Sequence, residues 1–307
     1  MVGLAHTLLL LALLTPPPES TNTKLQFVVE APAELAAAAH RVESLGGSDV
    51  GETLSLLGLG GVRGAIHVVL VPEGAPLASR APSWVAGYAL PPFATIVLFP
   101  ARVPSYPDRS LEALVSHEVA HLLIARAAGG VRLPRWFDEG LATVAAREWG
   151  IEDRARYAMA VIGSGPESTE ELDSGFLGDA AAATRSYALS AAFMRYLLQE
   201  YGREVAARII ARVSTGESFA TAFRAATGDP LAASEAAFFR RNTFWNTWVP
   251  FLTSATALWM GITLLALAAI RARRKRDAEM RARFARDEEP TPPTGVTRPD
   301  DERLRIN

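Results

Sequence analysis

The feature that most constrains this chain is a pair of histidines, His117 and His121, with Glu118 directly after the first of them. The surrounding residues 111–128 are rich in Leu, Ala, Val and Glu and contain no internal Gly or Pro, so they are predicted to form a helix. This stretch follows three helix-start signals, Pro107, Asp108 and Ser110. Residues four apart share one face of a helix, so the two imidazoles converge while Glu118 projects beside them.

A His-Glu-x-x-His pattern on a helix is typical of a zinc site in which the carboxylate acts on a bound water. The alternative is that His117 and His121 are only two polar residues of an amphipathic helix. Catalytic zinc usually has three protein ligands, so a third ligand should follow. A histidine six positions after His121 is excluded because Ala127 stands there, which leaves a carboxylate as the solution. Asp138 and Glu139 both lie at suitable positions, and spacing alone leaves both open.

At these residues the chain resembles the gluzincin metallopeptidases, the clan of thermolysin and the zinc aminopeptidases, and in particular the bacterial peptidase MA-like families. In that clan a second helix carries a Trp-aromatic-x-Glu-Gly pattern whose Glu completes the metal site, and residues 136–140 (Trp-Phe-Asp-Glu-Gly) match it. The resemblance implies that Glu139, and not Asp138, is the third ligand. It covers about residues 85–215, is specific at the two metal segments, and implies hydrolysis of a peptide or protein substrate.

The resemblance suggests two further roles. In related families a later helix begins with a Tyr, which in the aminopeptidase branch stabilises the oxyanion, so Tyr187 is the candidate here; the alternative is an aromatic that only packs. An edge strand before the metal helix pairs with an extended substrate in the clan, and residues 95–99 are the candidate, with an ordinary core strand as the alternative. The Gly-x-Met-Glu-Asn segment of aminopeptidases has no match in residues 51–109. This favours an endopeptidase, or a peptidase for which the sequence does not fix whether it cuts within a chain or from one end.

These residues predict one mechanism. His117, His121 and Glu139 are expected to hold Zn²⁺ with an open position for a water of lowered pKa. Glu118 is expected to take the proton of that water and return it to the leaving amine, while Tyr187 donates a hydrogen bond to the oxyanion. Each histidine should have a second partner, which the sequence does not name. A rival interpretation is a zinc-binding or scaffold module without turnover, and an intact Glu118 counts against it because zinc binding alone does not need that residue.

The fold class predicted is α+β, with a small N-terminal mixed sheet and a helical subdomain carrying the metal helix, as in thermolysin-like gluzincins. Short β-branched and apolar runs predict strands at 25–32, 66–72 and 95–100. Helices are predicted at 33–45, 134–149, 185–202, 204–213, 218–226 and 230–241, and a surface loop at 163–178. The domains expected are a signal peptide (1–22), a β-rich subdomain (23–108), a helical metallopeptidase subdomain (109–247), a transmembrane helix (248–270) and a basic, partly disordered tail (271–307).

Two apolar segments indicate export and membrane anchoring. Residues 8–14 form an apolar block too short to span a bilayer and followed by three prolines, which predicts a secretory signal peptide. Residues 249–270 contain no charge and lie between Trp248 and the basic cluster 271–276, which predicts a transmembrane helix with a cytoplasmic C-terminus. The catalytic segment would then lie on the periplasmic side of a bacterial cell membrane.

An intramembrane zinc protease is disfavoured because charged residues flank the metal motif, and the flanking residues are Arg109, Glu112 and Arg126.

The tail 271–307 is basic, with 11 Lys or Arg and 8 Asp or Glu, so the rest of the chain carries a small net negative charge. A mildly acidic domain has no basic surface of the kind that binds nucleic acid. The tail is expected to contact lipid headgroups.

The absence of cysteine excludes disulfides and thiol catalysis and leaves histidine and carboxylate as metal donors. Neither the physiological substrate nor the oligomeric state follows from the sequence.

Overall fold

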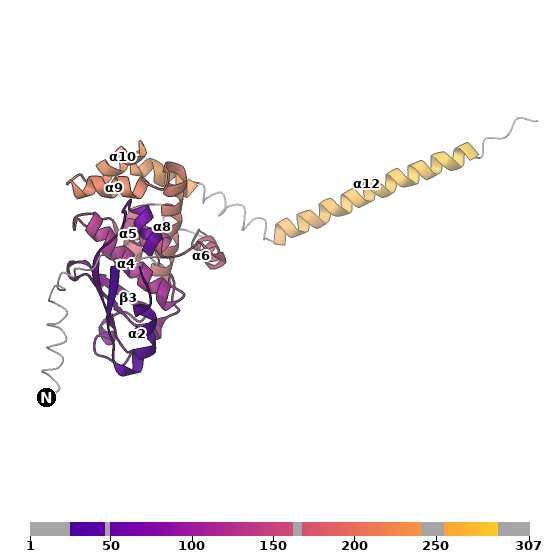
Figure 1. Cartoon of the computed structure of the whole chain (residues 1–307). Helices are drawn as coiled ribbons and strands as arrows, with labels where there is room; N and C mark the ends of the chain where they lie inside the picture. The colour runs from indigo at the N-terminus through magenta and orange to yellow at the C-terminus, as the bar shows by residue number, and fades with distance from the viewer. Residues whose placement is uncertain (1–24, 47–49, 162–167, 241–254, 288–307) are drawn as a thin grey trace, which may run out of the picture. The chain divides into compact units, whose positions relative to one another are not determined.

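A computed structural model describes residues 25–46, 50–161, 168–240 and 255–287 of the chain. It divides into two compact units, residues 1–246 and 247–307, which are described separately (Figure 1). Three expected features lie outside the described residues, in whole or in part: the signal peptide, the start of the transmembrane helix and the end of the tail.

The first unit contains a four-stranded mixed sheet in the order β1-β2-β4-β3. Three of its strands, β1 (Leu25–Glu30), β2 (Gly64–Leu70) and β4 (Thr95–Leu98), are parallel, and β3 (Gly87–Leu90) is antiparallel to β4. The three predicted strands and the mixed α+β fold are confirmed. Strand β3 was not predicted, because its sequence Gly-Tyr-Ala-Leu contains no β-branched residue and stops at two prolines.

The expected edge strand was the wrong one. β4 lies between β2 and β3, and all four of its residues are buried, so β3 forms the edge next to the metal helix. The Phe99 N–H donates to the Ala86 carbonyl at 2.7 Å, in the same register that pairs Gly87 with Leu98. Along an antiparallel pair, residues that hydrogen-bond to the partner strand alternate with residues whose N–H and C=O groups point away from it. Ala86 is hydrogen-bonded to Phe99, so Gly87 and Ala89 direct their N–H and C=O groups to the open edge.

The two faces of the sheet are both covered, as the burial of β2 and β4 shows. Successive side chains of a strand point to opposite faces. Ile66, Val68 and Leu70 belong to the main core, which includes α2 (Ala36–Glu43) and α4 (Leu111–Ala127). Val69 and Val97 belong to a smaller cluster on the other face. Helix α4 therefore lies between the sheet and the other helices (Figure 1).

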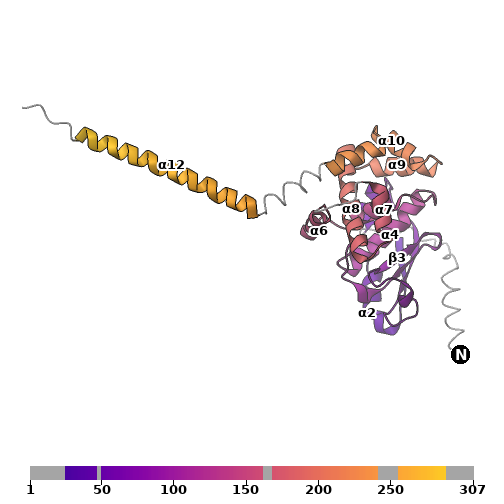
Figure 2. The same ribbon diagram turned by 180° about the vertical axis from the view of Figure 1, so that it is seen from behind.

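The helical half of the unit begins with α4 and packs around it. Its further elements are α5 (Arg135–Ala146), α6 (Ile151–Val161), α7 (Thr169–Gly175), α8 (Ala180–Tyr201), α9 (Val205–Ser214), α10 (Phe219–Thr227) and a final helical run 231–240. α7 and α8 lie side by side (Figure 2). One hydrophobic core joins this half to the sheet and to α3 (Gly51–Leu56), so the two expected subdomains share their interior.

Some boundaries differ from the predicted ones for local reasons. α8 begins at Ala180, five residues early, because the Asp179 side chain accepts a hydrogen bond from the Ala182 N–H at 2.9 Å. α7 is a helix inside the expected loop 163–178, and Ser168 caps it. α5 ends at Ala146 because Arg147 is extended, with φ of −164° and ψ of 159°.

The second unit contains a single described helix, α12 (Ala255–Asp287), which runs from the uncharged segment into the basic segment without a break. The side chains of residues 259–270 are exposed. Among the helices that the structure describes, none combines the length and the apolar character needed to cross a membrane.

Candidate metal centre

Helix α4 brings His117, Glu118 and His121 into the interior. It begins at Leu111 and is capped by Ser110, whose hydroxyl accepts a hydrogen bond from the Ala113 N–H at 3.1 Å. Most of its residues are buried, including His117 and Glu118, which are 3% and 5% exposed. Burying polar side chains in an apolar helix is costly unless they find partners, so their presence indicates a site.

Helix α5 supplies the third residue, Glu139, and two contacts fix its position. The Asp173 carboxylate of α7 accepts a hydrogen bond from the Trp136 N–H at 2.6 Å and so caps the start of α5. At Gly140, a Cβ atom would lie 2.6 Å from the carbonyl oxygen of Ser190 in α8. The Glu-Gly pair of the sequence pattern therefore places a carboxylate at the centre and, at the next residue, lets the backbones of α5 and α8 approach closely.

The three predicted ligands meet at one point. His117 Nε2 lies 3.1 Å from His121 Nε2, and Glu139 Oε2 lies 3.5 Å and 3.4 Å from these two nitrogens. A tetrahedral zinc ion with bonds of about 2.0–2.1 Å separates its ligand atoms by about 3.3 Å. Glu139 Oε2 is buried and has no hydrogen-bond partner among the described residues. The spacing, the donor types and the free carboxylate oxygen all fit a zinc ion.

Each histidine also faces a second carboxylate. Asp138 Oδ1 lies 3.0 Å from Nδ1 of His121, and Asp108 Oδ1 lies 3.7 Å from Nδ1 of His117. Asp108 is almost completely buried, in the loop before α4. Asp138 is thus a second partner of His121 that the sequence does not name. Asp108, in contrast, lies near His117 at a distance longer than a hydrogen bond, and neither of these two facing atoms has a hydrogen-bond partner among the described residues. Asp138 faces the nitrogen opposite the centre and stands outside the group of three.

The two buried glutamates have opposite electrostatic environments. Burial raises the pKa of Glu118 to about 7, although His121 and His117 act in the other direction. Burial also opposes ionisation of Glu139, but His121 and His117 outweigh it and hold the pKa of that carboxyl well below its usual range. Glu139 is therefore suited to remain a charged ligand, and Glu118 to take up and release a proton near neutral pH.

The pKa values of the two histidines shift in the same direction. Burial acts to lower them, but Asp108 and Glu139 raise the pKa of His117, and Asp138 and Glu139 raise that of His121 well above the usual value. The carboxylates thus concentrate negative charge around both rings, an environment that also favours a cation.

Tyr187 lies beside the centre on α8. Its ring centroid is 6.4 Å from that of His117 and 5.0 Å from that of Phe176, against which it packs edge to face. Burial, Glu139 and Glu118 raise its pKa well above the usual value, so the hydroxyl keeps its proton. That hydroxyl has no hydrogen-bond partner among the described residues. The position is compatible with both expected roles, the oxyanion donor and the packing residue.

Gly87 is a residue that the sequence analysis did not single out. A Cβ atom at this position would lie 3.1 Å from Glu118 Oε1 and 2.9 Å from Leu98 Cδ2. The backbone of the edge strand β3 therefore passes directly beside the carboxylate of Glu118. The only signal in the sequence is a glycine in a short strand, which often marks a close approach of another group.

Three side chains that could hold a metal ion lie on two helices, with a buried glutamate and an open strand edge beside them, and this arrangement is typical of a metallopeptidase-type domain. A family model described as the Peptidase MA superfamily matches residues 78–249, more than half of the chain, and the chain belongs to this superfamily. The family resemblance carried by the two metal segments is thereby confirmed. No curated protein matches the chain.

Proposed function

We propose that this protein is a zinc-dependent metallopeptidase that hydrolyses peptide bonds, with His117, His121 and Glu139 as the zinc ligands. The observation that carries the proposal is the triangle of Nε2, Nε2 and Oε2 atoms at 3.1–3.5 Å, beside a buried glutamate that is not needed to hold a metal. Membership of the Peptidase MA superfamily supports the same reaction class.

The chain's own residues have distinct roles in this reaction. Bound zinc would supply Lewis acidity at the scissile carbonyl and would lower the pKa of a bound water. Glu118, with a pKa near 7, takes a proton from the attacking water and returns it to the leaving amine. Tyr187 keeps its proton and donates a hydrogen bond to the oxyanion. Asp138 orients the His121 ring from its Nδ1 side, and Asp108 places a carboxylate 3.7 Å from Nδ1 of His117.

The edge strand β3 is the surface on which an extended substrate binds in this proposal. Gly87 and Ala89 offer their N–H and C=O groups, which pair with a substrate backbone irrespective of its side chains. Because Gly87 has no side chain, a backbone bound there can approach Glu118 closely. Peptides and proteins are therefore the expected substrates.

A zinc-binding module without turnover is the second candidate, and Glu118 counts against it. Zinc binding does not need this residue, and burying an additional carboxylate among apolar side chains costs free energy. Glu118 Oε2 has no hydrogen-bond partner among the described residues, so a purely structural role does not account for it.

We also propose that the protein is anchored in a bacterial cell membrane by residues 248–270, with the peptidase unit on the periplasmic side. Three features support this: the N-terminal apolar block, the absence of charge over 249–270, and the basic cluster 271–276. The exposed apolar side chains of α12 include Trp259, Leu264 and Leu265. Protease digestion of intact spheroplasts tests the topology, since it should remove the peptidase unit and spare a C-terminal tag.

The decisive experiment measures zinc content and hydrolysis of a mixed peptide library by the full chain, beside a Glu118→Gln variant. One zinc per chain with cleavage by the wild type only would support the mechanism. Zinc without cleavage by either protein would favour the binding module. A chain that binds no zinc would overturn both functions.

A further inference from the structure

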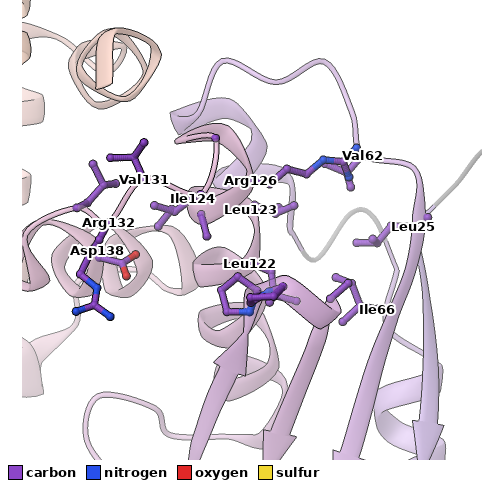
Figure 3. A pocket seen from close by; sticks show the side chains of 18 of the residues that line it. Leu25, Val62, Ile66, Leu122, Leu123, Ile124, Arg126, Val131, Arg132 and Asp138 are labelled. Atoms are coloured by element: carbon purple, nitrogen blue, oxygen red, sulfur yellow. The ribbon is translucent and has the colours of Figure 1, made fainter. Parts of the chain in front are cut away.

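A cavity of about 740 Å³ lies next to the metal centre and is not used by the proposed chemistry (Figure 3). Its lining is largely apolar and comes from the starts of β1 and β2, the last turns of α4 and the connection to α5. Asp138, the partner of His121, is part of its wall. The cavity therefore adjoins the second helix of the metal centre.

Three arginines line this cavity, Arg63, Arg126 and Arg132, and their side chains are exposed. None of them forms an ion pair or hydrogen bond with a described side chain, whereas Arg41 and Arg147 each pair with a carboxylate. The acidic side chain on the wall, Asp138, is already engaged with His121 at 3.0 Å. The cavity thus combines an apolar interior with positive charge that no described side chain neutralises.

The arginines stand on different sides of the cavity. In Figure 3, Arg132 lies on the side of Asp138 and Val131, and Arg126 lies toward Val62, with Leu122 between the two sides. An anionic group held there would meet a positive charge from either side, while an apolar group beside it would contact the lining. This arrangement suits a ligand that carries an anionic group next to an apolar group.

The cavity is continuous with the edge strand. Pro91, Pro92 and Ala94, which follow β3 directly, belong to its lining. A substrate paired with β3 would therefore extend from Glu118, beside Gly87, past Leu90 and into the cavity. Strand residues advance by about 3.3 Å each, so the cavity receives side chains about three to four residues from the scissile bond.

We propose that this cavity is a substrate-selection site for peptides with an acidic side chain next to an apolar one, about three to four residues from the bond that is cut. The inference deepens the proposed peptidase function and rests on it. The three arginines bind the carboxylate, and the apolar lining buries the neighbouring side chain. An exposed ion pair contributes little by itself, so selection depends on the combination of the three charges with apolar burial.

Binding measurements on the full chain with Glu118→Gln test this site without turnover. Short fluorescent peptides with a Glu-Leu pair are compared by anisotropy with peptides that have Gln-Leu at the same position. The acidic peptide should bind about tenfold more tightly at low salt, and the difference should shrink at high salt because exposed charges are screened. Equal binding of the two peptides would overturn the inference.

Variants identify the residues responsible. The combined change Arg63→Gln, Arg126→Gln and Arg132→Gln should abolish the preference and leave binding of the Gln-Leu peptide within about twofold. A control with the same loss of charge is Arg154→Gln, Arg224→Gln and Arg240→Gln, at exposed arginines outside the cavity lining, and it should keep the preference. Retention of the preference by the first variant, or its loss in the control, would contradict the proposal. Circular dichroism melting establishes that both variants fold.

A cleavage experiment separates this inference from the proposed function. Mass spectrometry of library products from the wild-type chain should place Glu or Asp at one position about three to four residues from the cut, and the first variant should lose this bias while it still cleaves. Cleavage without any acidic bias would overturn the selection site and leave the peptidase function standing. Preferential binding of acidic peptides with no cleavage by the wild type would overturn the peptidase function alone.

Discussion

The carboxylate of Asp138 lies 3.0 Å from Nδ1 of His121. The next residue along α5, Glu139, approaches Nε2 of the same ring at 3.4 Å. One turn of α5 thus places a carboxylate near each nitrogen of the imidazole: Asp138 orients the ring, and Glu139 lies where a shared metal ion is proposed. The His121 tautomer that carries its proton on Nδ1 leaves Nε2 free for a metal.

Asp138→Asn should weaken zinc binding by about 10–100-fold, because a neutral amide orients and polarises the ring less well than a carboxylate. Competition with a fluorescent zinc chelator gives the affinity directly, without a turnover assay. Glu170→Gln, which removes an exposed carboxylate from α7, is the matched control and should leave the affinity unchanged. An Asp138→Asn variant with wild-type affinity would show that the contact is incidental.

Gly87→Ala should lower kcat/KM by about 10–100-fold while zinc content stays normal, because small displacements of a catalytic group are costly. The new methyl group would stand 3.1 Å from Glu118 Oε1, so the carboxylate must move. Peptide hydrolysis and metal analysis on one preparation give both quantities. At Gly60 a Cβ atom meets open space, so Gly60→Ala should preserve the rate. Unchanged kcat/KM in Gly87→Ala would mean that Glu118 tolerates the displacement.

Gly140→Ala should lower the free energy of unfolding by about 1–3 kcal/mol, the usual cost of overpacking a well-packed interior. The added Cβ would lie 2.6 Å from the Ser190 carbonyl oxygen, a backbone atom that can move only with α8. Urea denaturation in the presence of a chelator isolates this packing effect from zinc binding. Gly74→Ala, at a position with open space, should change the free energy of unfolding little. Equal stability of the two variants would contradict the close approach of α5 and α8.

Asp153→Asn should lower the free energy of unfolding at pH 7 by about 3–5 kcal/mol, because it leaves the charge of a largely buried Arg147 without its partner. Arg147 donates two hydrogen bonds to the Asp153 carboxylate, at 2.6 Å and 2.5 Å, and the Gly150 N–H donates a third at 2.9 Å. The more exposed pair Arg109–Glu152 provides the control, since Glu152→Gln should cost about 1 kcal/mol or less.

The same ion pair should make the protein less stable in acid. Burial acts to raise the pKa of Asp153, but the hydrogen bonds from Arg147 and Gly150 outweigh it and lower the pKa below the usual 3.8. A carboxyl with a lowered pKa stabilises the fold above its ordinary pKa, and this contribution is lost as pH falls through the lowered value. Urea denaturation between pH 7 and pH 3 should show a smaller decline for Asp153→Asn than for the wild type. Parallel declines would exclude Asp153 as a source of the acid sensitivity.

The convergence of the candidate metal ligands could be predicted because it depends on local geometry. The spacing of His117 and His121 places them on one helix face whatever surrounds the helix, and the Glu-Gly pair at 139–140 follows a pattern with a defined role. Helix ends were less certain, because a single cap such as Asp179 moved the start of α8 by one and a half turns. A four-residue strand without β-branched residues gave too weak a signal to be recognised.

The sequence by itself thus determined the metal motif, most of the helices and the mixed α+β class, because each rests on residues that are neighbours along the chain. Tertiary structure alone decided that β3 and not β4 is the edge, that Asp108 faces His117, and that three arginines meet at one cavity. Such relationships join segments far apart in the sequence, and they arise only when burial of the shared core fixes how the sheet and helices pack.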